Sequence, residues 1–178
     1  MSSKINYGQF KIVLCRTSHP GNIGSTARAI KTMGFTHLTL VNPKQFPHAD
    51  ANALAAGAED ILTNATIVNR IEDALKDSHL IIGFTARQRE LSQEHKNIRE
   101  IASELKSESH SKKIALLFGN ETNGLSNDEL KHCHMLGYIN SNTNYSSLNL
   151  AQAVQIICYE IRMQLSEENE IISHVEEK

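Results

Sequence analysis

Short apolar runs alternate along the chain with longer segments whose apolar residues recur every three or four positions. Several runs hold four or five consecutive apolar residues, which is typical of strands buried on both faces. The longer segments have the spacing of amphipathic helices. The predicted strands lie at residues 10–15, 37–41, 66–68, 80–84, 114–118 and 135–139. The predicted helices lie at residues 23–33, 51–56, 71–76, 98–105, 127–132 and 148–165.

This alternation predicts an α/β fold built on a mostly parallel sheet with helices on both faces. A chain of 178 residues is long enough for one such domain, and no repeat or linker divides it. We therefore expect residues 1–165 to form a single domain and residues 166–178 to form an acidic tail. The most polar internal stretch, residues 92–100, is typical of a surface loop that leads into a helix.

Charge and cysteine content indicate where the protein works, but they do not identify its function. The net charge is −2, but the tail carries five glutamates and one lysine, which leaves residues 1–165 at +2. This mildly basic balance neither establishes nor excludes a nucleic-acid partner. The sequence has no apolar run of the ~20 residues that cross a bilayer, and its beginning lacks a secretory signal. With three scattered cysteines (Cys15, Cys133 and Cys158), we expect a cytoplasmic protein without a membrane partner.

Four loops rich in Gly, Asn, Ser or Thr follow predicted strands, at residues 18–24, 85–90, 119–125 and 140–149. In open parallel sheets, ligands bind beyond the carboxyl ends of the strands, where such loops meet. The loops offer mainly backbone donors and acceptors, which suit a neutral or zwitterionic adenosine-type ligand better than a polyphosphate. The first loop matches neither G-x-G-x-x-G nor a Walker sequence.

The first loop leads into a helix that carries a candidate functional arginine. Asn22 stands where we expect the N-cap, and Gly24 lies one helical turn below Arg28. A missing side chain below an arginine leaves room for a large partner to approach. The alternative is a capped surface helix whose two cations, Arg28 and Lys31, are solvated.

The third and fourth loops contain further polar candidates. Ser126 and Glu129 form an S-x-x-E capping box for the next helix, but this does not account for Glu121. Glu121 is therefore either a solvated carboxylate or a positioned acceptor. Before the last helix, Ser146 or Ser147 is the natural N-cap. We expect the apolar stripe of that helix to face the core or a partner.

Asn149 lies on the first turn predicted for the last helix, where asparagine costs helix propensity. A polar contact at the site explains it better. The sequence Lys131–Met135 also contains His132, Cys133 and His134. Adjacent and alternate residues rarely converge on one ion, and no second ligand pair lies at zinc spacing, so we expect no metal.

Taken together, three motifs resemble the signatures of the SpoU branch of the SPOUT RNA ribose 2′-O-methyltransferases. They are N-x-G-x-x-x-R at residues 22–28, F-G-x-E-x-x-G-L at 118–125 and S-S-L-N-L-A-x-A-V at 146–154. The resemblance extends over residues 10–165. Within the branch, the chain is most similar to the bacterial enzymes that methylate cytidine or uridine 32 in the tRNA anticodon loop.

The resemblance implies a deep trefoil knot in the C-terminal part of the sheet, which periodicity does not reveal. It implies an obligate homodimer with each active site at the subunit interface, S-adenosylmethionine as methyl donor, and tRNA or rRNA as partner. The catalytic residues carried over by motif are Asn22, Arg28, Glu121 and Asn149. The cofactor-binding residues carried over are Phe84, Thr85, Ala86, Gly119, Ile139, Ser146, Ser147 and Leu148.

Two departures from the family pattern concern substrate handling. Asn120 stands where the resemblance predicts an arginine, and Thr143 stands where a proline is common. Close relatives also carry a C-terminal extension that helps to grip tRNA, whereas this chain ends soon after the catalytic region. We expect phosphate contacts from other cations, namely Arg16, Lys31, Arg87 and Arg89.

Three other interpretations of function stay open on the sequence. Strand–helix alternation alone permits an NAD-dependent oxidoreductase, although G-x-G-x-x-G is absent. Asn120 leaves room for an RNA-binding relative that has lost methyl transfer. Within the methyltransferases, rRNA or another tRNA position is the alternative to nucleotide 32.

Overall fold

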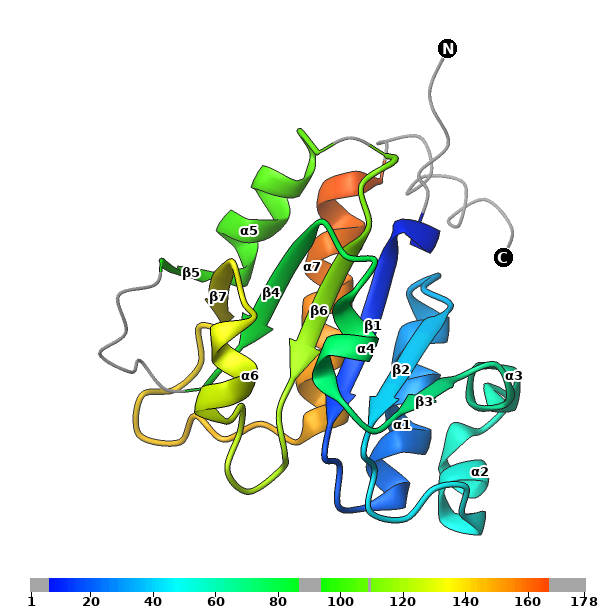
Figure 1. Cartoon of the computed structure of the whole chain (residues 1–178). Coiled ribbons are helices and arrows are strands. Elements are labelled where there is room, and N and C mark those ends of the chain that lie inside the picture. The colour runs from blue at the N-terminus through cyan, green and yellow to red at the C-terminus, as the bar shows by residue number, and fades with distance from the viewer. Residues whose placement is uncertain (1–6, 87–93, 109, 167–178) are drawn as a thin grey trace, which may run out of the picture.

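The computed structural model describes residues 7–86, 94–108 and 110–166, and Figure 1 shows their arrangement. The strands are β1 (Phe10–Cys15), β2 (His37–Val41), β3 (Thr66–Val68), β4 (Leu80–Phe84), β5 (His95–Asn97), β6 (Ile114–Phe118) and β7 (Met135–Tyr138). The helices are η1 (Tyr7–Gln9), α1 (Pro20–Thr32), α2 (Ala49–Ala55), α3 (Glu59–Thr63), α4 (Ile71–Leu75), α5 (Ile98–Leu105), α6 (Asn127–Lys131) and α7 (Leu150–Leu165).

The seven strands form one sheet in the order β3-β2-β1-β6-β4-β7-β5, and every neighbouring pair is parallel. β2 and β3 lie on one side of β1, and the later strands β4 to β7 lie on its other side. The order therefore reverses between β1 and β6, which is where open α/β sheets bind ligands. Leu14 of β1 and Phe84 of β4 both pair with Phe118, so these three strands end together.

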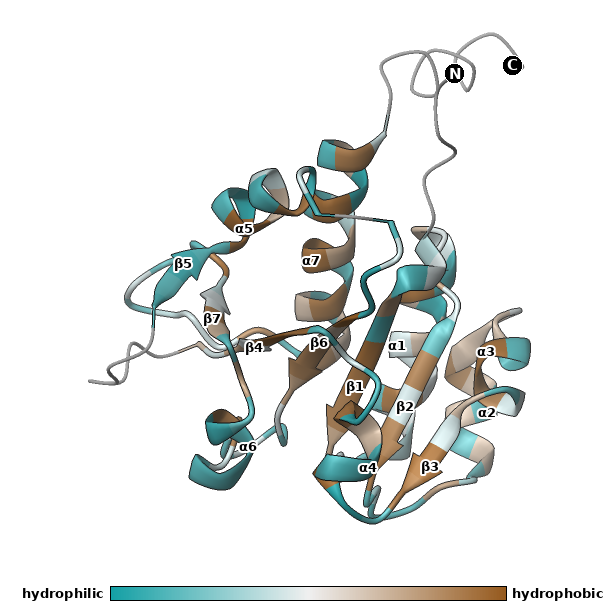
Figure 2. Ribbon diagram, turned by 45° about the horizontal axis from the view of Figure 1, so that its top comes forward, coloured by the Kyte–Doolittle hydropathy of each residue, from teal (hydrophilic) through white to brown (hydrophobic). Residues whose placement is uncertain are grey.

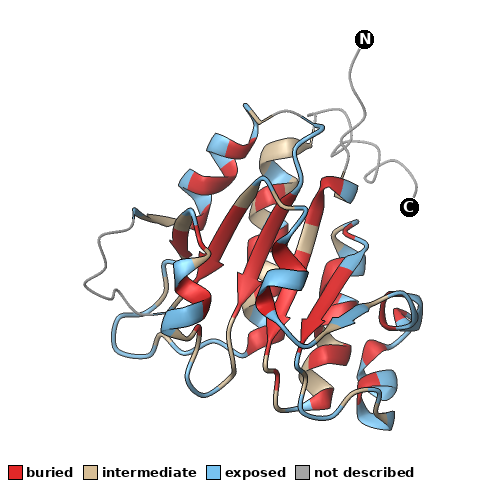
Figure 3. Ribbon diagram, in the orientation of Figure 1, coloured by how far each residue is buried: buried red, intermediate tan, exposed pale blue. Residues whose placement is uncertain are grey.

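Both faces of the sheet are covered, as predicted. Along β1, the side chains of Ile12 and Leu14 join the core under α1, α5 and α7. Val13 and Cys15 point to the opposite face and pack with residues of α4 and α6. The central strands are therefore buried on both sides, which explains their continuous apolar sequences (Figures 1 and 3).

The apolar stripe of the last helix, α7, packs into this core. Val154, Ile157, Cys158 and Ile161 are fully buried, and α7 packs against α1 and α5. Of the two alternatives for this stripe, the structure supports the core. The apolar side chains that α7 leaves exposed lie elsewhere on the helix, at Tyr159 and Met163.

Five of the six predicted strands have the observed bounds, and the sixth ends one residue earlier than predicted. The prediction missed β5, because His95, Lys96 and Asn97 are polar residues at the edge of the sheet (Figure 2). It also missed the five-residue helix α3. Within the described ranges, no helix is long and apolar enough to cross a membrane.

Candidate active site

The loop after β1 turns sharply into α1. Arg16 has a φ of 54°, and the helix begins at Pro20 with His19 as the N-cap. The predicted start at residue 23 was therefore three residues late, because proline suits the first helical position. Asn22 consequently lies within the first turn and is not the N-cap, so its side chain is available for other contacts.

The carboxylate of Glu121 anchors the amino end of α1. It accepts hydrogen bonds from the backbone N–H of Ser18 (2.8 and 3.1 Å) and of His19 (2.8 Å). It also accepts one from the Asn22 amide at 3.1 Å. Burial raises the pKa of Glu121, but these hydrogen bonds outweigh burial and leave the pKa below its ordinary value. Of the two alternatives for Glu121, the structure supports the positioned acceptor.

Asn149 continues this network from the third motif. Its Nδ2 donates to Oδ1 of Asn22 at 3.1 Å, while its own Oδ1 accepts from the backbone N–H of Ala151. Asn149 is therefore the N-cap of α7, and the expectation that Ser146 or Ser147 caps the helix was wrong. Glu121, Asn22 and Asn149 form one hydrogen-bonded line that joins all three motifs.

Asn120 ties the second motif to the first. Its Nδ2 donates to the carbonyl of Arg16 at 2.8 Å and to the hydroxyl of Ser18 at 2.9 Å. Its Oδ1 accepts from the backbone N–H of Thr122 at 2.9 Å. An amide that donates and accepts at once fits this position, and a cation does not supply the acceptor. The departure from arginine thus has a local structural role.

A half-buried ion pair also holds the loop after β1 against the loop after β6. The guanidinium of Arg16 donates to both carboxylate oxygens of Glu129, at 2.8 and 3.0 Å, and to the carbonyl of Gly124. Burial raises the pKa of Glu129, but the hydrogen bond and charge of Arg16, together with the hydrogen bonds from Ser126, outweigh burial and lower that pKa. The capping box of Ser126 and Glu129 is confirmed, but its remote partner Arg16 was not visible in the sequence. We predicted that Arg16 contacts phosphate, but its guanidinium is already bound to Glu129 and Gly124.

Arg28 lies on the exposed side of α1. Among the residues that the structure describes, it makes no hydrogen bond or ion pair, so its guanidinium is free to meet an anion. The space next to Gly24 is not open to a substrate, because a Cβ there would lie 2.0 Å from the carbonyl oxygen of Ala51 on α2. The expected path for a partner past Gly24 is therefore filled by a helix. Lys31 pairs with Asp60 at 2.8 Å.

The candidate cofactor residues come from loops after β4, β6 and β7, three adjacent strands. Thr85 donates its N–H to the carbonyl of Gly137, which holds the first loop against β7. Gly119 allows the second loop to fold back, since a Cβ would lie 2.0 Å from the backbone of Gly124. The third loop, residues 140–149, is largely exposed, including Leu148 at 36%.

The chemistry of this set fits an adenosine-type group. Its members are apolar (Phe84, Ala86, Ile139, Leu148), hydroxyl-bearing (Thr85, Ser146, Ser147) or glycine (Gly119), and none is charged. The side chain of Phe84 is buried and stacks on Phe118, so it supports the site from the core. The remaining members can pack on a flat base and hydrogen-bond a ribose, but they offer no cation for a polyphosphate. Arg87 and Arg89, predicted to contact phosphate, lie outside the described residues.

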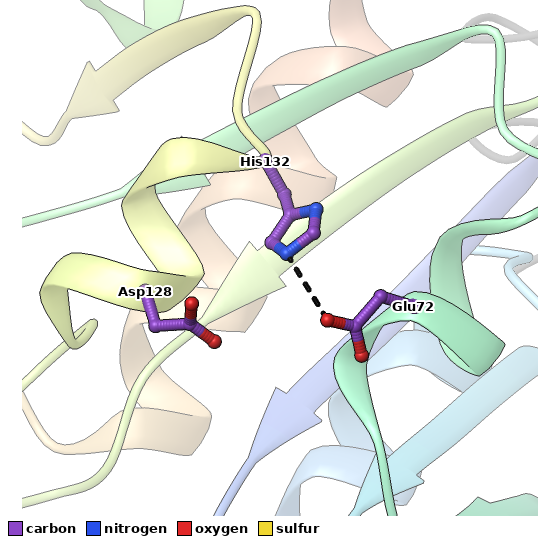
Figure 4. Close-up of side chains that lie close together, drawn as sticks. All are labelled: Glu72, Asp128 and His132. Carbon is purple, nitrogen blue, oxygen red and sulfur yellow. Dashed lines mark ion pairs between the residues drawn. The ribbon is translucent and has the colours of Figure 1, made fainter.

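The three candidate ligands between Lys131 and Met135 have different surroundings. His134 accepts a hydrogen bond from the Ile81 backbone, and Cys133 is buried. His132 instead lies 3.7 Å from Glu72 and near Asp128 (Figure 4). Glu72 is also 3.5 Å from Arg70, a cation that competes for the same carboxylate. Asp128 and His132 follow the second motif, but this largely exposed cluster contains no motif residue and carries no metal assignment.

Residues 9–159 match the model of the SpoU rRNA Methylase family. A tRNA (cytidine/uridine-2′-O-)-methyltransferase TrmJ of Citrobacter koseri is 51% identical over 153 residues, which cover 86% of this chain and 63% of that protein. The chain thus spans less than two thirds of that relative's length.

Solved structures agree with this similarity. A probable methylase family protein from Haemophilus influenzae has a TM-score of 0.85 and 44% identity, over 96% of this chain and 70% of that one. The SpoU methyltransferase AviRb from Streptomyces viridochromogenes, solved with the cofactor AdoMet, has a TM-score of 0.73 and 22% identity. That match covers 90% of this chain and 62% of AviRb, and shows a shared fold.

Proposed function

Because the chain belongs to the SpoU methylase family, we propose that it transfers a methyl group from S-adenosylmethionine to a ribose 2′-hydroxyl in RNA. The observation that carries this proposal is the hydrogen-bonded line Glu121–Asn22–Asn149, which joins the three motifs. The free guanidinium of Arg28 lies on the helix that this line anchors.

The methyl donor supplies an electrophilic carbon on a sulfonium when it is bound. In the proposed site, Gly119 and the loop ends at Phe84–Ala86, Ile139 and Ser146–Leu148 hold it. These residues include no cation for the diphosphate of NAD, and G-x-G-x-x-G is absent from the sequence, which favours this donor over NAD. A donor held at three loop ends presents its methyl group in one direction. Holding the methyl group and the ribose hydroxyl in line contributes much of the rate acceleration.

Arg28 acts in this proposal as a clamp. A guanidinium does not release its proton near neutral pH, so Arg28 is not the base. Its two parallel donors hold the phosphate next to the target ribose and lower the cost of negative charge on the 2′-oxygen. The phosphate or a water molecule takes the proton. Asn22 and Asn149 orient the ribose and the helix end, and Glu121 holds the loop.

We assign tRNA as the substrate, with cytidine or uridine 32 of the anticodon loop as the target nucleotide. The name of the Citrobacter koseri relative supports tRNA and the two bases, whereas position 32 rests on the motif resemblance. rRNA or another tRNA position is the alternative. An RNA-binding relative without methyl transfer is less favoured, because the hydrogen bonds of Asn120 explain why asparagine stands there. The candidate catalytic residue Arg28 is still present.

The functional unit in this proposal is a homodimer with each site shared between subunits. Arg28 has no hydrogen bond or ion pair to the candidate cofactor residues among the described ranges, which suits a site completed by a second chain. Tyr159 and Met163, 48% and 41% exposed on α7, offer an apolar contact surface. We also propose that the C-terminal part of the sheet forms a trefoil knot, and that the enzyme works in the cytoplasm, where its three free cysteines stay reduced.

The test is methylation of unmodified total tRNA with donor labelled in the methyl group, followed by mapping of the modified nucleotide. The expected result is label on a 2′-oxygen at position 32. Label at another position or in rRNA moves the substrate assignment. No label in any RNA, from protein that binds the donor, contradicts the proposed activity.

A further inference from the structure

A cleft of about 740 Å³ opens at the opposite end of the sheet from the candidate active site. It lies over the first residues of β1 and β2 and beside β3, on the face that carries α4. The cleft exists because α4 is short. Its five residues span roughly 7 Å, whereas β2 is roughly 16 Å long, so the helix leaves part of the sheet uncovered.

Four cations and two carboxylates line this cleft, and one of the cations, Arg70, also pairs with Glu72 outside the lining, which leaves an excess of one positive charge. The cations are Lys11, Arg70, Lys76 and Lys113, and the carboxylates are Asp73 and Asp77. Lys76 and Lys113 are exposed, and their ammonium groups make no hydrogen bond or ion pair among the described residues. Unpaired cations around a concave surface favour an anionic ligand.

Lys11 lies deeper, on the floor. Its ammonium donates to the carbonyl of Ala74, which fixes its position. Burial lowers the pKa of Lys11, and the nearby charges of Lys113 and Lys76 lower it further, against the effect of Asp77. Lys113 and Lys76 thus each repel the ammonium group of Lys11, while Asp77 attracts it. An anion between them relieves that repulsion.

The remaining lining residues match the other parts of a nucleotide. Thr39 and Thr66 offer hydroxyls beside the apolar side chain of Val68. Asn64, just before β3, has an amide whose Nδ2 already donates to the carbonyl of Asp60 at 2.9 Å, and its Oδ1 can accept from the edge of a base. The cavity volume lies in the range of ordinary small-ligand sites.

We infer that this cleft binds a nucleotide phosphate, with the phosphate between Lys11, Lys76 and Lys113 and the base near Asn64. The phosphate belongs either to a free mononucleotide or to a strand of RNA. The site is distinct from the methyl-transfer site, since it lies over the amino ends of β1 and β2 and along the edge strand β3, and takes no residue from the three motifs. It therefore stands or falls independently of the proposed activity.

The test follows the backbone amide NMR signals of the full-length protein during titration with uridine 5′-monophosphate, uridine, and a short single-stranded oligouridine. Uridine probes avoid the adenosine-type pocket. We expect saturable shifts at Thr39, Thr66 and Val68 with the monophosphate or the oligonucleotide, and much weaker binding of uridine. Binding of the monophosphate identifies a free nucleotide as the source, and binding of the oligonucleotide alone identifies an RNA strand.

The double variant Lys76→Gln, Lys113→Gln removes two cations without disturbing the Lys11 contact. It should weaken binding about tenfold or more, and for the oligonucleotide it should reduce the salt slope by about two. Lys106→Gln, on an exposed lysine after α5, is the matched control and should change nothing. Equal loss in the control, equal binding of uridine and its monophosphate, or no saturable shift with any probe overturns the inference.

Discussion

At the scale of single residues, the site depends on side chains that serve the fold and the chemistry together. Asn149 caps α7 and also donates to Asn22. Glu121 closes the amino end of α1 and holds the Asn22 amide. Arg28 is the exception, because it has no such structural partner among the described residues. A change at Arg28 should therefore affect catalysis without affecting stability.

Arg28→Lys tests the proposed clamp. An ammonium keeps the charge but cannot make two parallel hydrogen bonds to a phosphate. We expect kcat for tRNA methylation to fall about 100-fold or more, the usual cost of one lost transition-state donor, with unchanged donor affinity and melting temperature. Arg99→Lys, a change at an exposed arginine of α5 whose ion pair with Glu160 a lysine can keep, is the control. Turnover retained in Arg28→Lys contradicts the clamp.

Glu121→Gln should make stability depend less on pH. The pKa of Glu121 in the folded protein lies below its ordinary value of 4.5, so the charged form stabilises the fold. This contribution is complete above pH 4.5 and is lost as the pH falls through the folded value. We expect the variant to be less stable by about 1–2 kcal/mol at pH 7. The difference should shrink in acid.

The measurement is urea unfolding at several pH values, with Glu59→Gln, on an exposed residue of α3, as the control. A constant difference between wild type and Glu121→Gln from neutral to acidic pH refutes the assigned role of the carboxylate.

At the scale of elements, two glycines of α1 give a matched pair. A Cβ on Gly24 would lie 2.0 Å from the Ala51 backbone, whereas one on Gly21 would meet only the end of the half-exposed Leu54 side chain, at 2.8 Å. Gly24→Ala should force α1 and α2 apart and cost about 1–3 kcal/mol or more. Gly21→Ala should be close to neutral. Equal melting temperatures for both variants would show that α2 does not pack on Gly24 as described.

The sequence predicted the presence of helices and strands better than it predicted where the helices begin and which distant residues are in contact. Apolar runs set the central strands, because burial on both faces leaves few alternatives for such residues. The start of α1 at Pro20 and the cap at Asn149 depend on local geometry that several nearby residues satisfy equally well. The contacts of Gly24 with Ala51 and of Arg16 with Glu129 join distant segments, and no local pattern encodes them. For the same reason, the functional use of Gly24 was mispredicted.

At the scale of the whole molecule, the proposed shared site predicts complementation between defective subunits. Arg28→Ala removes the clamp, and Leu148→Glu places a charge in the cofactor loop. Each variant alone should be inactive. After subunit exchange in an equal mixture, half of the dimers are mixed and each holds one intact site, so activity should recover to about a quarter of wild type. No recovery despite confirmed exchange indicates that both groups act within one chain.

The central claim is that the loop ends of β4, β6 and β7 form a pocket for the methyl donor. Isothermal titration calorimetry of the purified protein with S-adenosylmethionine, its demethylated product and NAD tests this claim most directly. The account predicts saturable heat with the first two ligands at one site per chain and none with NAD. Absence of heat with both the donor and its product, or preferential binding of NAD, would contradict it.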